Sequence, residues 1–235
     1  MKKFKTLFVA LLAMATATTA KAQDNVEAEI SADIVSAYHW RGQELGEAAI
    51  QPTLGVAYKG LSLTAWGSAP LKGNDETKEF DLTLAYSTGG FNVGITDYFS
   101  VQGSPRYFEY EAHKTAHVFE ANIGYDFGPV NLQWYTNFAG ADGVNKDGKR
   151  AYSSFVEAKA PFALGGLDWE ASIGAVPFAT SFYEKANGFA VTDISLQATK
   201  DIKITDSFSV PVFAAIHTNP STEKAAFVIG FTLKP

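Results

Sequence analysis

Residues Val26 to Gly42 read VEAEISADIVSAYHWRG, and apolar and polar side chains alternate along this stretch. The even positions carry the apolar members, namely Val26, Ala28, Ile30, Ala32, Ile34, Tyr38 and Trp40. The odd positions carry Glu27, Glu29, Ser31, Asp33, His39 and Arg41. Successive side chains on a strand point to opposite faces of the sheet, so the pattern predicts a strand with one apolar face and one charged face.

The length of this alternation is unusual for a strand of a water-soluble protein, where about five or six residues are typical. A strand that crosses a bilayer needs about 9 to 11 tilted residues. We therefore interpret residues 26–42 as the first wall strand of a membrane β-barrel.

The first 22 residues have the organisation of a signal peptide. Lys2, Lys3 and Lys5 form a basic start, residues 7–13 form a short apolar run, and Ala20-Lys21-Ala22 is a cleavage pattern. The apolar run is too short for a membrane-spanning helix. We expect a cleaved signal peptide over 1–22 and an exported barrel domain over 23–235.

Composition excludes several classes of protein. The chain has no cysteine, which excludes disulfides, thiolate metal sites and thiol catalysis. Four of its 19 Lys and Arg residues lie in the first 22 positions, which leaves 15 against 25 Asp and Glu. Such an acidic chain repels the phosphates of nucleic acid, so no nucleic-acid partner is expected.

The same alternation recurs to the end of the chain and predicts 12 strands. Expected connections near residues 60, 89, 128, 164 and 204 are short, and those near 45, 74, 107, 145, 183 and 221 are longer. An even strand count with alternating short and long connections is typical of bacterial outer-membrane barrels. The predicted fold is all-β: a transmembrane antiparallel up-and-down barrel of about 12 strands.

Aromatic side chains cluster where the apolar strands end, which fits the two aromatic belts of a spanning barrel. One group lies near the short turns: Tyr58, Tyr86, Phe91, Tyr125, Trp169 and Phe208. The other lies near the long loops: Trp40, Phe80, Phe119 and Tyr152. A water-soluble sandwich, with these rings in its core and the charged positions in solvent, is the alternative.

The polar face of the expected strands carries many carboxylates and few cations. The candidate pore-lining residues are Glu29, Asp33, Lys59, Glu79, Asp81, Glu120, Glu157, Lys159 and Asp193. Like charges remain ionised only where water or counter-ions reach them, so a wet lumen of this kind would prefer cations. Twelve strands lie between about eight, where side chains fill a barrel, and about 16, where a channel stays open. The sequence leaves both an open channel and a closed barrel possible.

Part of the chain resembles outer-membrane porins of the TorF type. The resemblance lies in Ser36-Ala37-Tyr38-His39-Trp40-Arg41-Gly42, in Gln51-Pro52, in the hairpin at Gly60 and in Leu63-Thr64-Ala65-Trp66. The family usually has an acidic residue where this chain has Ala37, and many outer-membrane barrels end on an aromatic residue where this chain ends on Pro235. The resemblance implies an outer-membrane channel and supplies no catalytic residues.

Histidines are the remaining candidates for chemistry. His113 and His117 are four positions apart but lack the glutamate of a metalloprotease motif. His39 and His217 could in principle serve a membrane hydrolase, although no G-x-S-x-G motif occurs. We therefore assign no catalytic, cofactor or metal-binding residue and expect a protein that is not an enzyme.

The function predicted from the sequence is a porin-like channel for small solutes in the bacterial outer membrane. The alternatives are a structural or surface-recognition barrel without an open pore and, less favoured, a membrane hydrolase. The expected partners are outer-membrane lipid, small hydrophilic solutes and, during biogenesis, the barrel-assembly machinery.

Overall fold

The computed structural model describes residues 26–72, 77–101, 106–184, 186–206 and 208–235. The expected signal peptide, residues 1–22, lies outside the described residues. Within the described residues, no helix is both long enough and apolar enough to cross a membrane.

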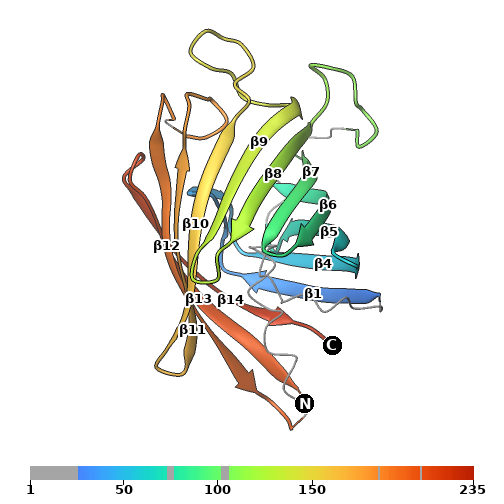
Figure 1. The fold of residues 1–235 in the computed structure, drawn as a ribbon, viewed down its shortest axis with the longest axis vertical. Coiled ribbons are helices and arrows are strands. Elements are labelled where there is room, and N and C mark those ends of the chain that lie inside the picture. The colour runs from blue at the N-terminus through green and yellow to red at the C-terminus, as the bar shows by residue number, and fades with distance from the viewer. Residues whose placement is uncertain (1–25, 73–76, 102–105, 185, 207) are drawn as a thin grey trace.

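Twelve strands of the described chain close into one barrel in which each strand pairs antiparallel with its neighbours along the chain (Figure 1). They are β1 (Glu27–Val35), β4 (Ala49–Tyr58), β5 (Leu61–Pro70), β6 (Lys78–Thr88), β7 (Phe91–Val101), β8 (His117–Asp126), β9 (Asn131–Gly140), β10 (Ser154–Leu164), β11 (Leu167–Val176), β12 (Ala190–Lys203), β13 (Ser209–Asn219) and β14 (Lys224–Leu233). A separate two-stranded sheet consists of β2 (Tyr38–Trp40) and β3 (Gln43–Gly46). The predicted all-β barrel of 12 antiparallel strands is confirmed.

The connections alternate between short turns at one end of the barrel and longer loops at the other. Lys59-Gly60 and Gly89-Gly90 are two-residue turns in which both residues have positive φ. Such turns match the twist of a hairpin, and glycine adopts this conformation without a steric cost. β1 begins and β14 ends at the short-turn end, as an even strand count requires.

The distribution of side chains in the barrel is the reverse of that in a water-soluble protein, whose apolar side chains face the interior. Large apolar side chains in the middle of the wall strands face outward and are exposed, including Ile30, Leu54, Leu63, Leu84, Ile95, Ile123, Ile173, Ile216 and Ile229. Their neighbours on the inner face are polar and buried, including Ser31, Thr53, Thr64, Asp81, Asn92, Glu120, Gln133, Ser172 and Asp193. The sandwich alternative is wrong, because the apolar rows do not pack against one another.

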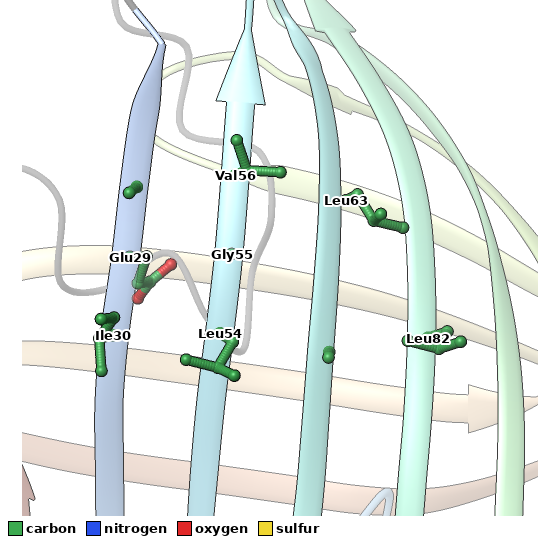
Figure 2. A pocket seen from close by; sticks show the side chains of 9 residues that line it. Glu29, Ile30, Leu54, Gly55, Val56, Leu63 and Leu82 are labelled. Atoms are coloured by element: carbon green, nitrogen blue, oxygen red, sulfur yellow. The ribbon is translucent and has the colours of Figure 1, made fainter.

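Part of this outer surface is a shallow apolar hollow over β1, β4, β5 and β6 (Figure 2). Ile30, Leu54, Val56, Leu63 and Leu82 line it. Apolar rows of this extent on an outer wall require apolar surroundings, because exposing them to water is unfavourable.

The barrel closes through a short pairing of its first and last strands. Ala32 to Val35 of β1 pair with Gly230 to Leu233 of β14, whereas nine residues of β1 pair with β4. Closure leaves no strand edge along the paired length, so backbone N–H and C=O groups there are satisfied within the wall.

The first strand is shorter than the sequence pattern predicted. β1 ends at Val35, a bend follows at Ser36 and Ala37, and residues 38–46 form the β2–β3 hairpin. The prediction of one strand through Gly42 is therefore wrong. The alternation continued across the bend because the hairpin is itself extended and has the same period of two.

The predicted aromatic belts are largely on the outer face. Tyr58, Tyr86, Phe91, Tyr125 and Phe208 are exposed near the short turns, and Phe80 and Tyr152 are exposed near the long loops. Trp40 is the exception, because it lies on β2 and stacks against Tyr183 inside the barrel. Its assignment to a belt is wrong.

Replacing an outward apolar residue tests the surroundings of the wall. Ile95 is 48% exposed in the middle of β7, so Ile95→Arg should lower the free energy of unfolding in phospholipid vesicles by about 2–4 kcal/mol. The measurement is denaturant-induced unfolding of the vesicle-inserted barrel. Val144→Arg is the control, because Val144 is 45% exposed but lies in the loop after β9. Equal stability of the two variants would contradict a lipid-facing wall.

Candidate functional site

The β2–β3 hairpin, which we call the inner hairpin, is folded into the barrel. Its turn is Arg41-Gly42, and both residues have positive φ. Gly42 lies so close to β12 that an added Cβ would stand 1.7 Å from the carbonyl oxygen of Thr192. The side-chain amide of Asn219 on β13 donates a hydrogen bond to the carbonyl of Gly42 at 2.9 Å. The hairpin turn is thus held against two wall strands, and only glycine fits there.

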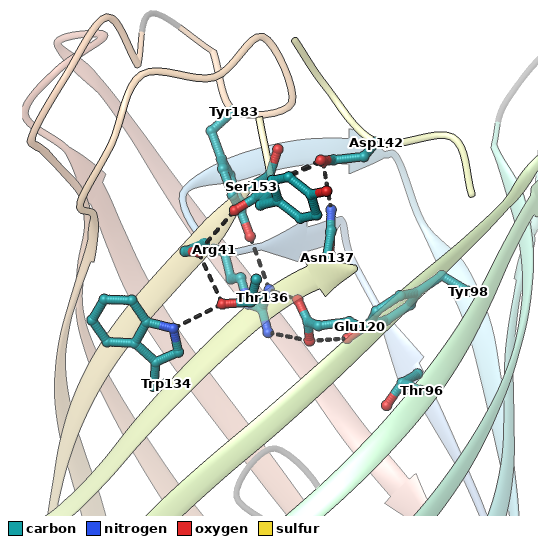
Figure 3. A network of polar contacts seen from close by, with 12 residues as sticks. Arg41, Thr96, Tyr98, Glu120, Trp134, Thr136, Asn137, Asp142, Ser153 and Tyr183 are labelled. Carbon is teal, nitrogen blue, oxygen red and sulfur yellow. Dashed lines mark hydrogen bonds and ion pairs between the residues drawn. The ribbon is translucent and has the colours of Figure 1, made fainter. Parts of the chain in front are cut away.

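Arg41 forms a buried ion pair with Glu120 of β8 (Figure 3). Two guanidinium nitrogens reach the two carboxylate oxygens at 2.5 and 2.9 Å. Tyr98 donates its hydroxyl to Glu120 at 2.9 Å, and Tyr183 accepts a hydrogen bond from Arg41 at 2.9 Å. A bidentate, hydrogen-bonded pair is the arrangement in which two charges are tolerated away from water.

Aromatic rings surround the Arg41 guanidinium. Its carbon lies 4.4 Å from the ring centre of Trp40, 4.0 Å from that of Tyr135 and 4.9 Å from that of Phe155. Cation–π contacts of this kind contribute about 2 kcal/mol when desolvated. Tyr183 stacks on both Trp40 and Phe155. We call Arg41, Glu120 and these rings the arginine cluster.

The loop between β11 and β12, residues 177–189, brings Tyr183 to this cluster. Thr180 of the same loop hydrogen-bonds Ser153 at 2.6 Å, and its hydroxyl accepts from the backbone N–H of Phe182. Burial raises the pKa of Tyr183, so its hydroxyl stays protonated. The β11–β12 loop and the inner hairpin, which are far apart in the sequence, therefore meet inside the barrel near its long-loop end.

The structure places the predicted pore-lining residues as follows. Glu29, Asp33, Glu79, Asp81, Glu120, Glu157, Lys159 and Asp193 lie on the inner face, buried or half-buried. Lys59 does not, because it is an exposed residue of the turn after β4 and lies over the ring of Tyr58. Its alternation parity pointed inward, but the strand ends one residue earlier.

Several inward carboxylates lie outside the arginine cluster. Glu79 accepts a hydrogen bond from the hydroxyl of Tyr38 at 3.0 Å, and one oxygen of the neighbouring Asp81 is buried without a hydrogen-bond partner among the described residues. Asp33, near the end of β1, accepts a hydrogen bond from the hydroxyl of Thr232 at 2.6 Å. Small polar side chains also line the inner face, including Thr64, Thr83, Thr96, Ser172 and Ser195.

Lys159 lies between two carboxylates on the inner face. Its ammonium group is 3.4 Å from Glu157 and 3.8 Å from Glu170, and its side chain is buried. The alternation predicted Lys159 as a pore-lining residue but not which acids it contacts, because strand register decides this.

Three residues of different elements meet beside the inner hairpin. The ring centres of His39 on β2 and His217 on β13 are 4.1 Å apart. Nδ1 of His217 lies 3.2 Å from a carboxylate oxygen of Asp193 on β12. Burial and the neighbouring His217 lower the pKa of His39 to about 4, so its imidazole is neutral at neutral pH. From the sequence, His39 and His217 were candidates only for a hydrolase.

The other histidine pair has a different setting. His117 is fully buried on the outer parity of the wall, beneath Tyr107 and Tyr110 of the β7–β8 loop. Its ring nitrogens contact Asp97 at 2.7 Å and the carbonyl of Tyr107 at 2.6 Å. His113 is an exposed loop residue. The two histidines therefore do not form a shared site.

No family model and no curated protein matches the chain. Solved structures that are similar in shape include a mutant porin from Rh. blastica, with 13% identity and a TM-score of 0.38 over 80% of this chain. The chain spans 55% of the length of that porin. The NanC porin gives 9% identity and a TM-score of 0.44, covering 89% of this chain and 100% of its own.

A COG4313 outer membrane channel from Pseudomonas putida F1 is also similar. It gives 11% identity and a TM-score of 0.39, with 92% of this chain and 98% of that chain covered. At these values the likenesses do not bear on what this chain does.

Removing the charge of Glu120 should release the inner hairpin. Glu120→Gln leaves the buried Arg41 without its anion, and loss of one partner of a buried pair costs about 3–5 kcal/mol. We expect tryptic cleavage after Arg41 of the folded barrel to become at least tenfold faster. Glu157→Gln is the matched control, because Glu157 is also an inward acid but contacts Lys159. Equal cleavage in both variants would show that the pair does not hold the hairpin.

Proposed function

We propose that this chain is a porin-like channel of the bacterial outer membrane through which small hydrophilic solutes pass passively, with a preference for cations. The observation that carries the proposal is the inverted barrel: an apolar outer wall around an inner face lined with polar and acidic side chains. In lipid, only a closed barrel or a helix satisfies its backbone groups.

The charge of the inner face supports a wet interior. Inward carboxylates of the wall are Glu29, Asp33, Glu79, Asp81, Glu120, Glu157, Glu170 and Asp193. In the described wall strands, Lys159 is the one inward lysine or arginine that is buried or half-buried. Arg41 adds a second cation from the inner hairpin. Such an excess of acids stays ionised only with access to water and counter-ions, and acidic linings favour cations.

The arginine cluster supplies the constriction of this channel. It joins the inner hairpin, the β11–β12 loop and the wall near the long-loop end. Solutes that enter past the long loops would meet this narrowing before the small polar side chains in the middle of the wall strands, such as Thr83, Thr96 and Ser172. Size selection would thus depend on how the inner hairpin and the β11–β12 loop pack against the wall.

The route to the membrane follows from the sequence. The expected signal peptide over 1–22 would direct export, and the barrel-assembly machinery would insert the chain among outer-membrane lipids. The resemblance to TorF-type porins agrees with this assignment. Its residues Tyr38 to Gly42 are those of the inner hairpin.

A barrel closed by the arginine cluster is the second candidate. The specific observation in its favour is that aromatic rings pack around Arg41, whose guanidinium also pairs with Glu120 and Tyr183. Such a barrel would hold its long loops for recognition of a partner.

Conductance in planar bilayers under a salt gradient tests cation preference. Glu29→Gln/Asp33→Asn should lower the cation-to-anion permeability ratio, because both acids lie on the inner face of β1. Asp206→Asn is the control, since Asp206 is a fully exposed acid in the turn after β12 and should leave the ratio unchanged. Anion selectivity of the unaltered protein would refute the preference, and absence of any conductance would refute the channel.

Opening the constriction tests the role of the arginine cluster. Tyr183→Ala removes a ring that stacks on both Trp40 and Phe155, and we expect single-channel conductance to rise about two-fold or more. Phe162→Ala is the control, because Phe162 is exposed on the β10–β11 hairpin. If the unaltered protein is silent and only Tyr183→Ala conducts, the closed barrel is the correct assignment.

A further inference from the structure

His39, Asp193 and His217 form a cluster that the proposed channel does not use. Each side chain offers one ligand atom, and these atoms all lie within 4.8 Å of one another. The residues come from the inner hairpin, β12 and β13, so the cluster exists only once the hairpin has folded into the barrel. Two imidazoles and one carboxylate on three elements are a donor set and not a charged surface patch.

One atom of the cluster is buried and unsatisfied. Nδ1 of His39 has no hydrogen-bond partner in the described part of the chain. A buried polar atom left in this state costs about 1–3 kcal/mol, and an ion that is bound there is one explanation of such an atom. The carboxylate of Asp193, 7% exposed, is the nearby anion that would balance part of a cation's charge.

We propose that His39, Asp193 and His217 bind a divalent transition-metal ion of the zinc class. Imidazole nitrogen suits zinc, copper and nickel, and one carboxylate with two histidines leaves at least one position open for water or solute. Ligand atoms around tetrahedral zinc are about 3.3 Å apart. Movements of roughly 1 Å by these side chains would bring the three ligand atoms to that spacing. Calcium and magnesium are disfavoured, because they take oxygen ligands.

The bound ion would join the inner hairpin to the wall. Gly42 already contacts Thr192 and accepts a hydrogen bond from Asn219, on the same two strands that carry Asp193 and His217. The site therefore lies where the hairpin is docked, on the side of its turn that faces β12 and β13. Metal binding would add a further attachment to these contacts and to the ion pair of Arg41 with Glu120.

Calorimetric titration with Zn²⁺ tests the site without reference to transport. The mature chain is purified in detergent without a polyhistidine tag, stripped with a chelator and titrated with Zn²⁺ alone. We expect one ion per chain, and His39→Ala or His217→Ala should weaken binding at least about tenfold, since losing even an outer-shell partner costs about 10–100-fold. His113→Ala, in the exposed β7–β8 loop, is the matched control and should bind as the unaltered protein does.

A folding control accompanies each variant. Heat-dependent migration on a gel shows whether the barrel has folded, and His39→Gln replaces His39→Ala if the alanine variant fails this control. Co²⁺ in place of Zn²⁺ should give the visible absorption of a low-symmetry site with nitrogen and oxygen ligands, and this absorption should be lost in His39→Gln. Undetectable Zn²⁺ binding by the folded unaltered protein, or binding unchanged in the folded His39 and His217 variants, would overturn the proposal. Because binding is measured directly, a silent channel would not affect this result.

Discussion

The pairing of β1 with β14 is the constraint on which the rest of the structure depends. Four residue pairs convert a twelve-stranded sheet into a closed wall. Once the sheet is closed, the backbone is satisfied along the paired strands, and the two faces become an outside and an inside. Most of the alternating side chains are then separated: apolar rows surround the barrel, and polar rows share a confined interior.

That confinement explains the chemistry of the interior. Carboxylates that would be solvated on an open sheet lie on a curved inner face, where each needs a hydrogen bond, a cation or water. Glu120 is satisfied by Arg41 and Tyr98, Asp33 by Thr232, and Glu157 lies beside Lys159. The inner hairpin contributes the strongest of these partners, because its arginine brings a permanent charge to the long-loop end.

The wall and the interior loops differ in how well the sequence predicted them. Alternation identified the number of wall strands, their orientation and eight of the nine inward residues that had been singled out. It failed at Ser36 and Ala37, where the strand bends while the period of two continues into the inner hairpin. It also failed at Lys59, where parity was right but the strand had already ended. The alternation of side chains along one stretch does not show where the chain bends or where a strand ends.

The sequence by itself determined the barrel: its alternation, its turns and the faces on which apolar and acidic residues lie are local properties of the chain. Only the tertiary structure decided what fills the interior. Arg41 and Glu120, and likewise His39 and His217, are far apart in the chain and meet because closure and strand register bring their elements together. Register is a relation between strands, so no single stretch of sequence contains it.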